Sequence, residues 1–231
     1  MDKKSYYGKV FDMKYLPSFA KKTIIVGTNW TFHGMLHMDF CEKMFCLTLE
    51  LIVFVFITAF LVNFVKLEFS MLLAFLMGHT FNWVFNGHLF VLLKDIGYKK
   101  TSIPQFLKYI VKLKNRFEQE TSILAVGAFG SLSRGKITES SDLDIRVIRK
   151  KGIINGLKSC TFVFFERSIA FLKRFPLDIY VLDDLSKLSD LREDEPPVIL
   201  YDPDGVLESN YNTVIHFEDI PHQFVNDKII L

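Results

Sequence analysis

Residues 130–144 read GSLSRGKITESSDLD. The first seven letters, GSLSRGK, fit most of the phosphate-binding loop G-x-x-x-x-G-K-[ST], in which backbone N–H groups cradle phosphates. That loop needs a serine or threonine after its lysine, because the hydroxyl binds magnesium, but here Lys136 is followed by Ile137. The Rossmann pattern G-x-G-x-x-G does not occur either. The glycines alone therefore identify neither kind of nucleotide site.

Aspartates on two predicted strands supply what the loop lacks. Residues 141–148, SDLDIRVI, alternate as a strand does, so Asp142 and Asp144 should point to the same face. Adjacent carboxylates repel each other unless a cation lies between them, and oxygen-only ligands suit Mg²⁺. A further predicted strand at 176–183, PLDIYVLD, places Asp178 in a similar apolar setting. Three carboxylates beside a loop rich in N–H groups predict a site for phosphoryl or nucleotidyl transfer.

The stretch resembles the signature of the DNA polymerase β-like nucleotidyltransferase superfamily, in which Gly-Ser is followed by Asp-x-Asp. The fuller pattern is similar to that of the minimal prokaryotic nucleotidyltransferases, and its residues here are Gly130, Ser131, Arg134, Gly135, Ser141, Asp142 and Asp144. The strand at 176–183 matches the third-carboxylate strand of that family, and VILYDPDG at 198–205 resembles the segment that closes these domains. The resemblance covers residues 103–207.

The resemblance implies an α+β (mixed α/β) fold, a small mixed sheet with flanking helices. It implies that Gly130 and Ser131 hold the β- and γ-phosphates of a nucleoside triphosphate and that Arg134 helps to neutralise them; ATP is favoured by the family alone. Asp142 and Asp144 would bind two Mg²⁺ ions, for which Mn²⁺ is an alternative. Asp178 would share one ion and favour deprotonation of an acceptor hydroxyl, which attacks the α-phosphorus and releases pyrophosphate.

Other polar residues near the site leave alternatives open. Arg146 shares a strand face with the aspartates, and either approaches the triphosphate or pairs with an acid. Ser133 and Lys136 are interpreted as solvated. Two more aspartates at the end of the third-carboxylate strand, Asp183 and Asp184, compete with the central one for its role.

Two long apolar stretches precede this module. Residues 44–65 carry one charge, Glu50, and residues 69–93 carry none. Each is long enough to cross a hydrocarbon core of about 30 Å. The short link between them, residues 66–68, predicts a two-helix transmembrane hairpin over 43–94. The alternative is a buried helical hairpin of a soluble protein.

Charges flanking the apolar stretches predict the orientation. Residues 1–43 hold seven lysines, residues 94–116 hold six lysines and an arginine, and the turn holds one lysine. The positive-inside bias then places both termini and the catalytic module in the cytoplasm of a two-pass cell-membrane protein. The net charge of +2 gives no case for a nucleic-acid partner. Three cysteines without a C-x-x-C pattern indicate reduced thiols.

The chain is thus divided into a basic, aromatic segment (1–42), the hairpin (43–94), a catalytic domain (101–207) and a tail (208–231). Further elements are expected as a short strand at 22–27, a helix from Ser102, a strand at 122–129 and a helix at 157–175. The helix from Ser102 should bury the apolar residues Phe106, Leu107, Ile110, Val111 and Phe117, with Lys114 as an exception on that face.

Polar residues on the second apolar stretch share one helical face. His79, Asn82 and Asn86 lie at i, i+3 and i+7, and Glu50 on the first stretch is their expected partner. They indicate either interhelical hydrogen bonding or contact with a lipid-linked substrate or a partner membrane protein. His33 and His37 have a metal-type spacing but lack further ligands.

These observations predict a membrane-anchored, Mg²⁺-dependent nucleotidyltransferase that moves a nucleoside monophosphate to a hydroxyl acceptor. About 25 residues follow residue 205, too few for an acceptor-binding domain. The acceptor site is therefore expected from the N-terminal half, another subunit or a partner protein, and the acceptor from lipid-, glycan- or protein-linked hydroxyls. The alternatives are a membrane-tethered module that binds nucleotide without turnover, and an antitoxin-like protein adenylyltransferase.

Overall fold

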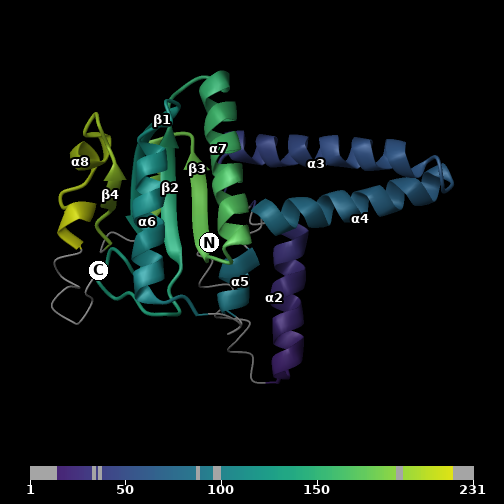
Figure 1. The fold of residues 1–231 in the computed structure, drawn as a ribbon, viewed down its shortest axis with the longest axis horizontal. Coiled ribbons are helices and arrows are strands. Elements are labelled where there is room, and N and C mark those ends of the chain that lie inside the picture. Colours follow the sequence, from purple (N-terminus) through teal and green to yellow (C-terminus); the bar gives the residue numbers. More distant parts are fainter. Residues whose placement is uncertain are drawn as a thin grey trace.

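A mixed sheet with a helical hairpin extending from one side makes up the fold (Figure 1). The computed structural model describes residues 15–32, 35, 38–86, 89–95, 100–190 and 195–220. Within these ranges the predicted mixed α/β architecture, a small mixed sheet with flanking helices, is confirmed.

The sheet has five strands, whose order places two candidate site strands side by side. The strands are β1 (Ile123–Phe129), β2 (Leu143–Arg149), β3 (Leu177–Leu182), β4 (Val198–Tyr201) and β5 (Ile215–His216), in the order β3-β2-β1-β4-β5. β1 is antiparallel to β2 and β4, whereas β2 and β3 are parallel, as are β4 and β5. Parallel neighbours need a crossover, and α7 (Ile153–Leu172) provides it between β2 and β3. This order leaves β3 at an edge.

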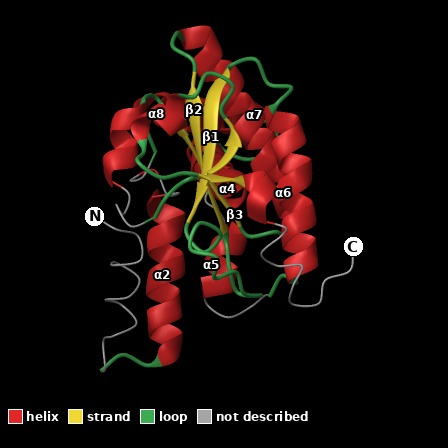
Figure 2. Cartoon of the chain, turned by 90° about the vertical axis from the view of Figure 1, so that its left-hand side faces the viewer, coloured by secondary structure: helices red, strands yellow, loops and turns green. Residues whose placement is uncertain are grey.

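Helices α6 (Ile103–Phe117) and α7 cover one face of the sheet (Figure 2). The main core lies between them and the inward side chains of the strands. α6 begins after Ser102 with a proline in its first turn, as predicted, although the Ser102 side chain makes no capping hydrogen bond. Val111, predicted on the buried face, is exposed, and Tyr109 and Leu113 are buried instead. The buried positions of α6 thus follow the 3.6-residue helical period, and the predicted apolar face departed from that period at Val111.

A smaller cluster lies on the opposite face, around the ends of β1, β2 and β3. Its buried residues are Ala125, Phe129, Ile148, Leu182, Leu188 and Leu207. The 3-10 helix η2 (Leu185–Asp190) and the short helix α8 (Val206–Asn210) contribute the residues outside the sheet. The chain continues through β5 into a second 3-10 helix, η3 (Phe217–Asp219), for which the sequence showed no periodicity.

Residues 18–32 near the N-terminus are helical. Residues 22–27, predicted as a short strand, lie inside α2 (Ser18–Phe32), so that prediction is wrong. Six residues, a lysine followed by five β-branched or small ones, are too few to show a helical period, and the contacts decide the outcome. Ile25 is buried against Leu92 of α5 (Leu89–Asp95).

Helices α3 (Phe40–Leu61) and α4 (Leu67–Asn86) form an antiparallel hairpin that projects from the side of the sheet near β3 and α7 (Figure 1). The interhelical hydrogen bonding that the shared polar face indicated is present. His79 Nδ1 lies 2.9 Å from Glu50 Oε1, and Asn82 Nδ2 donates to Glu50 Oε2 at 2.9 Å. His79 Nε2 also lies 3.1 Å from the carbonyl oxygen of Trp30, which ties α2 to the hairpin.

The two helices differ as membrane spans. Among the helices of the described ranges, only Phe40–Leu61 is long and apolar enough to cross a membrane. The predicted second span is not supported, because the apolar stretch at 69–93 is divided between α4 and α5 and carries His79, Asn82 and Asn86. Both helices nevertheless expose large apolar side chains, among them Leu51, Val55, Phe56, Phe60, Phe69, Leu72, Phe75 and Met77.

Gly78 lies where α4 approaches the backbone of α3, and this contact can be tested by substitution. A Cβ at Gly78 would lie 3.5 Å from the backbone nitrogen of Phe54, an ordinary contact. We expect Gly78→Ala to be tolerated, but Gly78→Leu to overpack the contact and destabilise the hairpin by about 1–3 kcal/mol. Thermal unfolding of the detergent-solubilised protein measures both.

The matched control is Gly27→Leu in α2, because a Cβ at Gly27 has nothing within 4 Å. Equal unfolding temperatures for the two leucine variants would contradict the close approach of α3 and α4.

Candidate active site

The two strand-borne carboxylates lie side by side. β2 and β3 pair in parallel with Asp144 directly beside Asp178, on strands that neighbour each other at about 4.8 Å. The alternate residues of both strands, such as Ile145 and Ile179, are buried in the core under α6 and α7, so the two carboxylates face the opposite side. β2 begins at Leu143, so Asp142 precedes the strand instead of lying on it.

Arg146 pairs with an acid, which is one of the two alternatives that the sequence left open. Its Nη2 lies 3.8 Å from Asp178 Oδ2, and its Nη1 donates to the carbonyl oxygen of Asp178 at 3.3 Å. The guanidinium lies 4.9 Å from the centroid of the Tyr180 ring. A cation here offsets part of the repulsion between the neighbouring carboxylates of Asp144 and Asp178.

The glycine at the end of β1 is in contact with the aspartate of β2. Gly130 has a φ of +72°, and a Cβ there would lie 2.0 Å from Asp144 Oδ2. No other residue fits at this position, because a side chain would meet both the strained backbone conformation and the carboxylate. The backbone N–H of Lys136 donates to the carbonyl oxygen of Ser131 at 2.9 Å and closes the loop. Ser131 Oγ is buried and makes no hydrogen bond to any described residue, which is uncommon for a buried hydroxyl.

Glu195, which was not predicted from the sequence, holds this loop in place. Its carboxylate accepts hydrogen bonds from the Arg134 guanidinium and, at 3.3 Å, from the Gly130 N–H. Ser133, interpreted as solvated, is buried and donates to the carbonyl oxygen of Pro196 at 2.5 Å. The only local signal was a glutamate before Pro-Pro at the start of a strand.

The competing aspartates at the far end of β3 have structural partners. Asp183 accepts from Arg149 Nε at 2.7 Å and from the backbone N–H of Cys41 at 3.2 Å. Asp184 is exposed, and hydrogen bonds from Ser186 lower the pKa of its carboxyl group. Of the three acids on or after β3, only Asp178 lies beside the carboxylate of β2.

The candidate metal-binding side chains at the site offer only oxygen atoms as ligands. Within the described part of the chain, no group of three or more His, Cys, Asp and Glu side chains could hold a metal ion. The groups that do meet, two carboxylates beside a loop with a buried hydroxyl, have the chemistry that Mg²⁺ prefers. His33 and His37 lie outside the described residues.

The three cysteines are free, as predicted. Cys41 Sγ and Cys160 Sγ lie 4.0 Å apart. Burial, and secondarily the neighbouring Cys41, raises the pKa of the Cys160 thiol. A thiol held in its protonated form is a poor nucleophile, so Cys160 is not a candidate catalytic residue.

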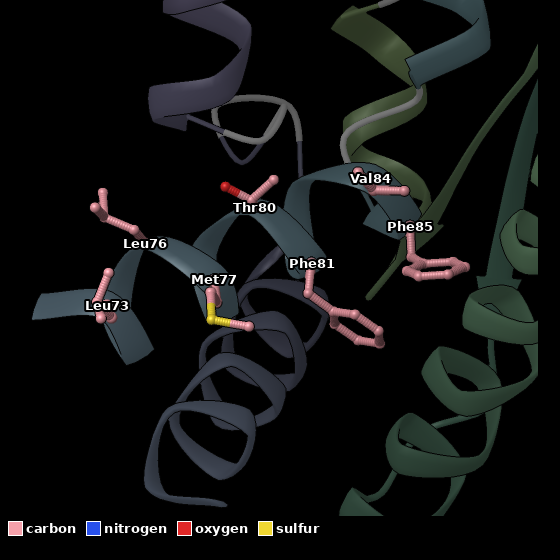
Figure 3. Close-up of a pocket in the computed structure, with 7 residues that line it drawn as sticks. All are labelled: Leu73, Leu76, Met77, Thr80, Phe81, Val84 and Phe85. Carbon is pink, nitrogen blue, oxygen red and sulfur yellow. The ribbon is translucent and has the colours of Figure 1, made fainter. Parts of the chain in front are cut away.

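A cavity of about 460 Å³ lies on α4 (Figure 3). It is lined by Leu73, Leu76, Met77, Thr80, Phe81, Val84 and Phe85. All but Thr80 are apolar, and no candidate carboxylate lines it. The cavity is therefore part of the apolar surface of the hairpin and not a phosphate site.

Residues 111–195 match the family model described as Polymerase beta, Nucleotidyltransferase. This range starts inside α6, ends at Glu195, and includes the loop at 130–135 and all three candidate carboxylates. The match supports the superfamily resemblance and nucleotidyl transfer as the general activity. It does not extend over the hairpin. No curated protein and no solved structure matches the chain.

The contact between Gly130 and Asp144 can be tested with a matched pair of glycine substitutions. Gly130 and Gly135 both have positive φ, +72° and +62°, but a Cβ at Gly135 meets nothing within 4 Å. Both alanine variants should lose about 1–2 kcal/mol to the left-handed conformation. Only Gly130→Ala should also displace the Asp144 carboxylate, so it should lower the melting temperature further. Equal melting temperatures for the two variants would contradict the contact.

Proposed function

We propose that the protein is a membrane-associated nucleotidyltransferase that moves a nucleoside monophosphate from a nucleoside triphosphate to a hydroxyl acceptor and releases pyrophosphate. The observation that carries the proposal is the register of β2 and β3, which pairs Asp144 with Asp178 beside the Gly130 loop. The family match over 111–195 supports the same general chemistry. ATP is the nucleotide proposed, on the family resemblance alone.

Gly130, Ser131 and Arg134 are proposed to bind the triphosphate. The buried Ser131 hydroxyl, which has no hydrogen-bond partner within the described ranges, is the best-supported donor for a phosphate oxygen. The Gly130 N–H donates to Glu195 at 3.3 Å, a long bond that a phosphate oxygen would share or replace. Because Glu195 also binds the Arg134 guanidinium, we assign Arg134 a smaller share of phosphate binding than the resemblance implies.

Asp142, Asp144 and Asp178 are proposed to hold two Mg²⁺ ions, for which Mn²⁺ is a substitute. Bound ions would neutralise charge on the triphosphate and on the leaving pyrophosphate. The oxygen-only donors of these residues support this assignment. Asp144 has its carboxylate against the Gly130 backbone, which places it beside the proposed phosphate loop.

Asp178 is proposed to take the proton from the acceptor hydroxyl. The acceptor oxygen forms a bond to the α-phosphorus, the bond from that phosphorus to the bridging oxygen breaks, and its electron pair leaves with pyrophosphate. Asp178 is almost fully buried, at 4% exposure, and its backbone carbonyl and carboxylate both lie near Arg146. These contacts hold the carboxylate in one orientation and support a role for Arg146 in positioning it.

The proposal predicts that single charge-removing substitutions abolish transfer. The detergent-solubilised protein is incubated with Mg²⁺, each α-labelled nucleoside triphosphate in turn, and an extract of its own membranes. Asp144→Asn and Asp178→Asn should each reduce labelling of lipid, glycan or protein at least about a hundredfold. Asp184→Asn, an exposed acid after the same strand, is the control and should retain activity. Label that persists in both site variants would contradict the proposal.

The same assay separates the alternatives. Labelled nucleotide that binds the wild-type protein but is never transferred would favour the regulatory module without turnover. Label on one partner protein would favour the antitoxin-like protein adenylyltransferase. Label in the lipid or glycan fraction would assign a membrane-linked acceptor.

We also propose that the hairpin inserts into the cell membrane, with the catalytic domain and both termini on the cytoplasmic side. Large apolar side chains cover α3 and α4, and almost none of the spanning window of α3 is buried in the protein. The antiparallel arrangement returns the chain to the side from which it entered. Lysines on both flanks support a cytoplasmic side.

Membrane insertion predicts an effect of charge at the middle of α3. Val55 and Phe56 are 56% and 76% exposed. Replacing both with lysine should cost about 2.5–3.5 kcal/mol for each residue at a bilayer centre, and so release the protein from liposomes in a flotation assay. The control is Leu172→Lys on α7, where the leucine is 78% exposed on the body of the protein. Flotation of the double lysine variant with the liposomes would contradict insertion.

A further inference from the structure

The strand that carries Asp178 has side chains as its outer neighbours. Among the described strands, β3 lies at the edge of the sheet, so one row of its backbone groups faces no other strand of that set. The backbone N–H of Val181 donates to Glu42 Oε2 at 3.0 Å, and the carbonyl oxygen of Ile179 accepts from Arg167 Nη2 at 2.5 Å. Glu42 comes from the first turn of α3 and Arg167 from α7.

Glu42 and Arg167 also form a buried ion pair. Arg167 Nη2 donates to Glu42 Oε1, and the two side chains are 4% and 1% exposed. Burial disfavours the charge on the guanidinium, but neighbouring acidic groups, Glu42 foremost, more than offset this, so the pKa of Arg167 lies above its ordinary value. Removing either partner would leave a buried charge without compensation, which is strongly destabilising.

A chain of hydrogen bonds continues from this pair into the hairpin. Arg167 Nη1 donates to Asn86 Oδ1 at 3.1 Å, and Asn86 Nδ2 donates to Asn82 Oδ1 at 2.7 Å. Asn82 Nδ2 in turn donates to Glu50 Oε2 at 2.9 Å. The polar interior of the hairpin is thereby linked to the backbone of Ile179, the residue after the third candidate carboxylate.

We infer that Glu42 and Arg167 are positioning residues for nucleotidyl transfer, and that through them the hairpin is part of the catalytic unit as well as its anchor. The inference rests on the proposed function for its kinetic consequence. Both side chains bond the backbone within three residues of Asp178, at the outer edge of the sheet formed by the described strands. The position of the Asp178 carboxylate follows the position of this backbone, and small displacements of a reacting group are costly to the rate.

The test compares substitutions of Glu42 with the same substitutions of Glu68, an exposed glutamate in the first turn of α4. Glu42→Gln keeps an acceptor for the Val181 N–H but loses the charge that balances Arg167, and Glu42→Ala loses both. Asn86→Ala is a milder variant that removes the hydrogen bond between Arg167 and α4 and leaves the one between Arg167 and Glu42 of α3. Each full-length protein in detergent is assayed for kcat, for KM of the nucleotide, and for hydrogen exchange in residues 177–183.

We expect Glu42→Ala to lower kcat about tenfold or more, with KM for the nucleotide within about twofold, because the carboxylate that meets the acceptor is displaced and the phosphate loop is not. Exchange in residues 177–183 should be faster in Glu42→Ala than in Glu42→Gln, and the Glu68 variants should match the wild type. If Glu42→Ala does not fold, kcat, KM and exchange are measured for Glu42→Gln and Asn86→Ala and compared with those of the Glu68 variants.

The positioning role is overturned if kcat and exchange in the Glu42 variants equal those in the Glu68 variants. It is also overturned if exchange rises while kcat stays unchanged. A wild-type protein that transfers no nucleotide under any condition would instead overturn the proposed function. In that case the exchange comparison still decides whether Glu42 and the hairpin hold β3, because it requires no turnover.

Discussion

The open edge of β3 is the constraint on which the arrangement of the molecule depends. A strand at the edge of a sheet leaves backbone donors and acceptors that must find partners elsewhere. In the described part of the chain those partners include two side chains, one from the hairpin and one from α7, which also neutralise each other's charge. The contacts at this edge therefore cover the open side of the sheet, attach the apolar hairpin to it and hold the strand that carries the third carboxylate.

Charges around the candidate site are arranged in pairs that already exist before a substrate binds. Asp178 has Arg146 beside it, and Arg134 has Glu195. A triphosphate that enters such a site meets acids as well as bases, so it needs additional cations to be held there. The chemistry of the donor oxygens agrees with that need, because hard divalent ions are the cations that carboxylates bind best.

Much of the fold and half of the site follow from local patterns. Alternation along two strands placed Asp144 and Asp178 among buried apolar residues, and the Gly-Ser loop was recognisable from its letters. Their adjacency in register depends on the sheet order, which periodicity could not predict. Glu195, Glu42 and Arg167 were not predicted, because each acts on a segment distant in sequence and no spacing rule connects them. Local pattern also failed at residues 22–27, where six residues fit a strand or a helix equally well.

The attachment of the first turn of α3 to the sheet has a consequence for substrate choice if the hairpin is inserted as proposed. Glu42 belongs to the first turn of the spanning helix and is bonded to the sheet, so no flexible linker separates the two at that point. The catalytic face would then stand at a fixed height above the lipid head groups. Hydroxyls presented at that height would react and others would not, so the protein would select its acceptors by the distance of their hydroxyl groups from the bilayer.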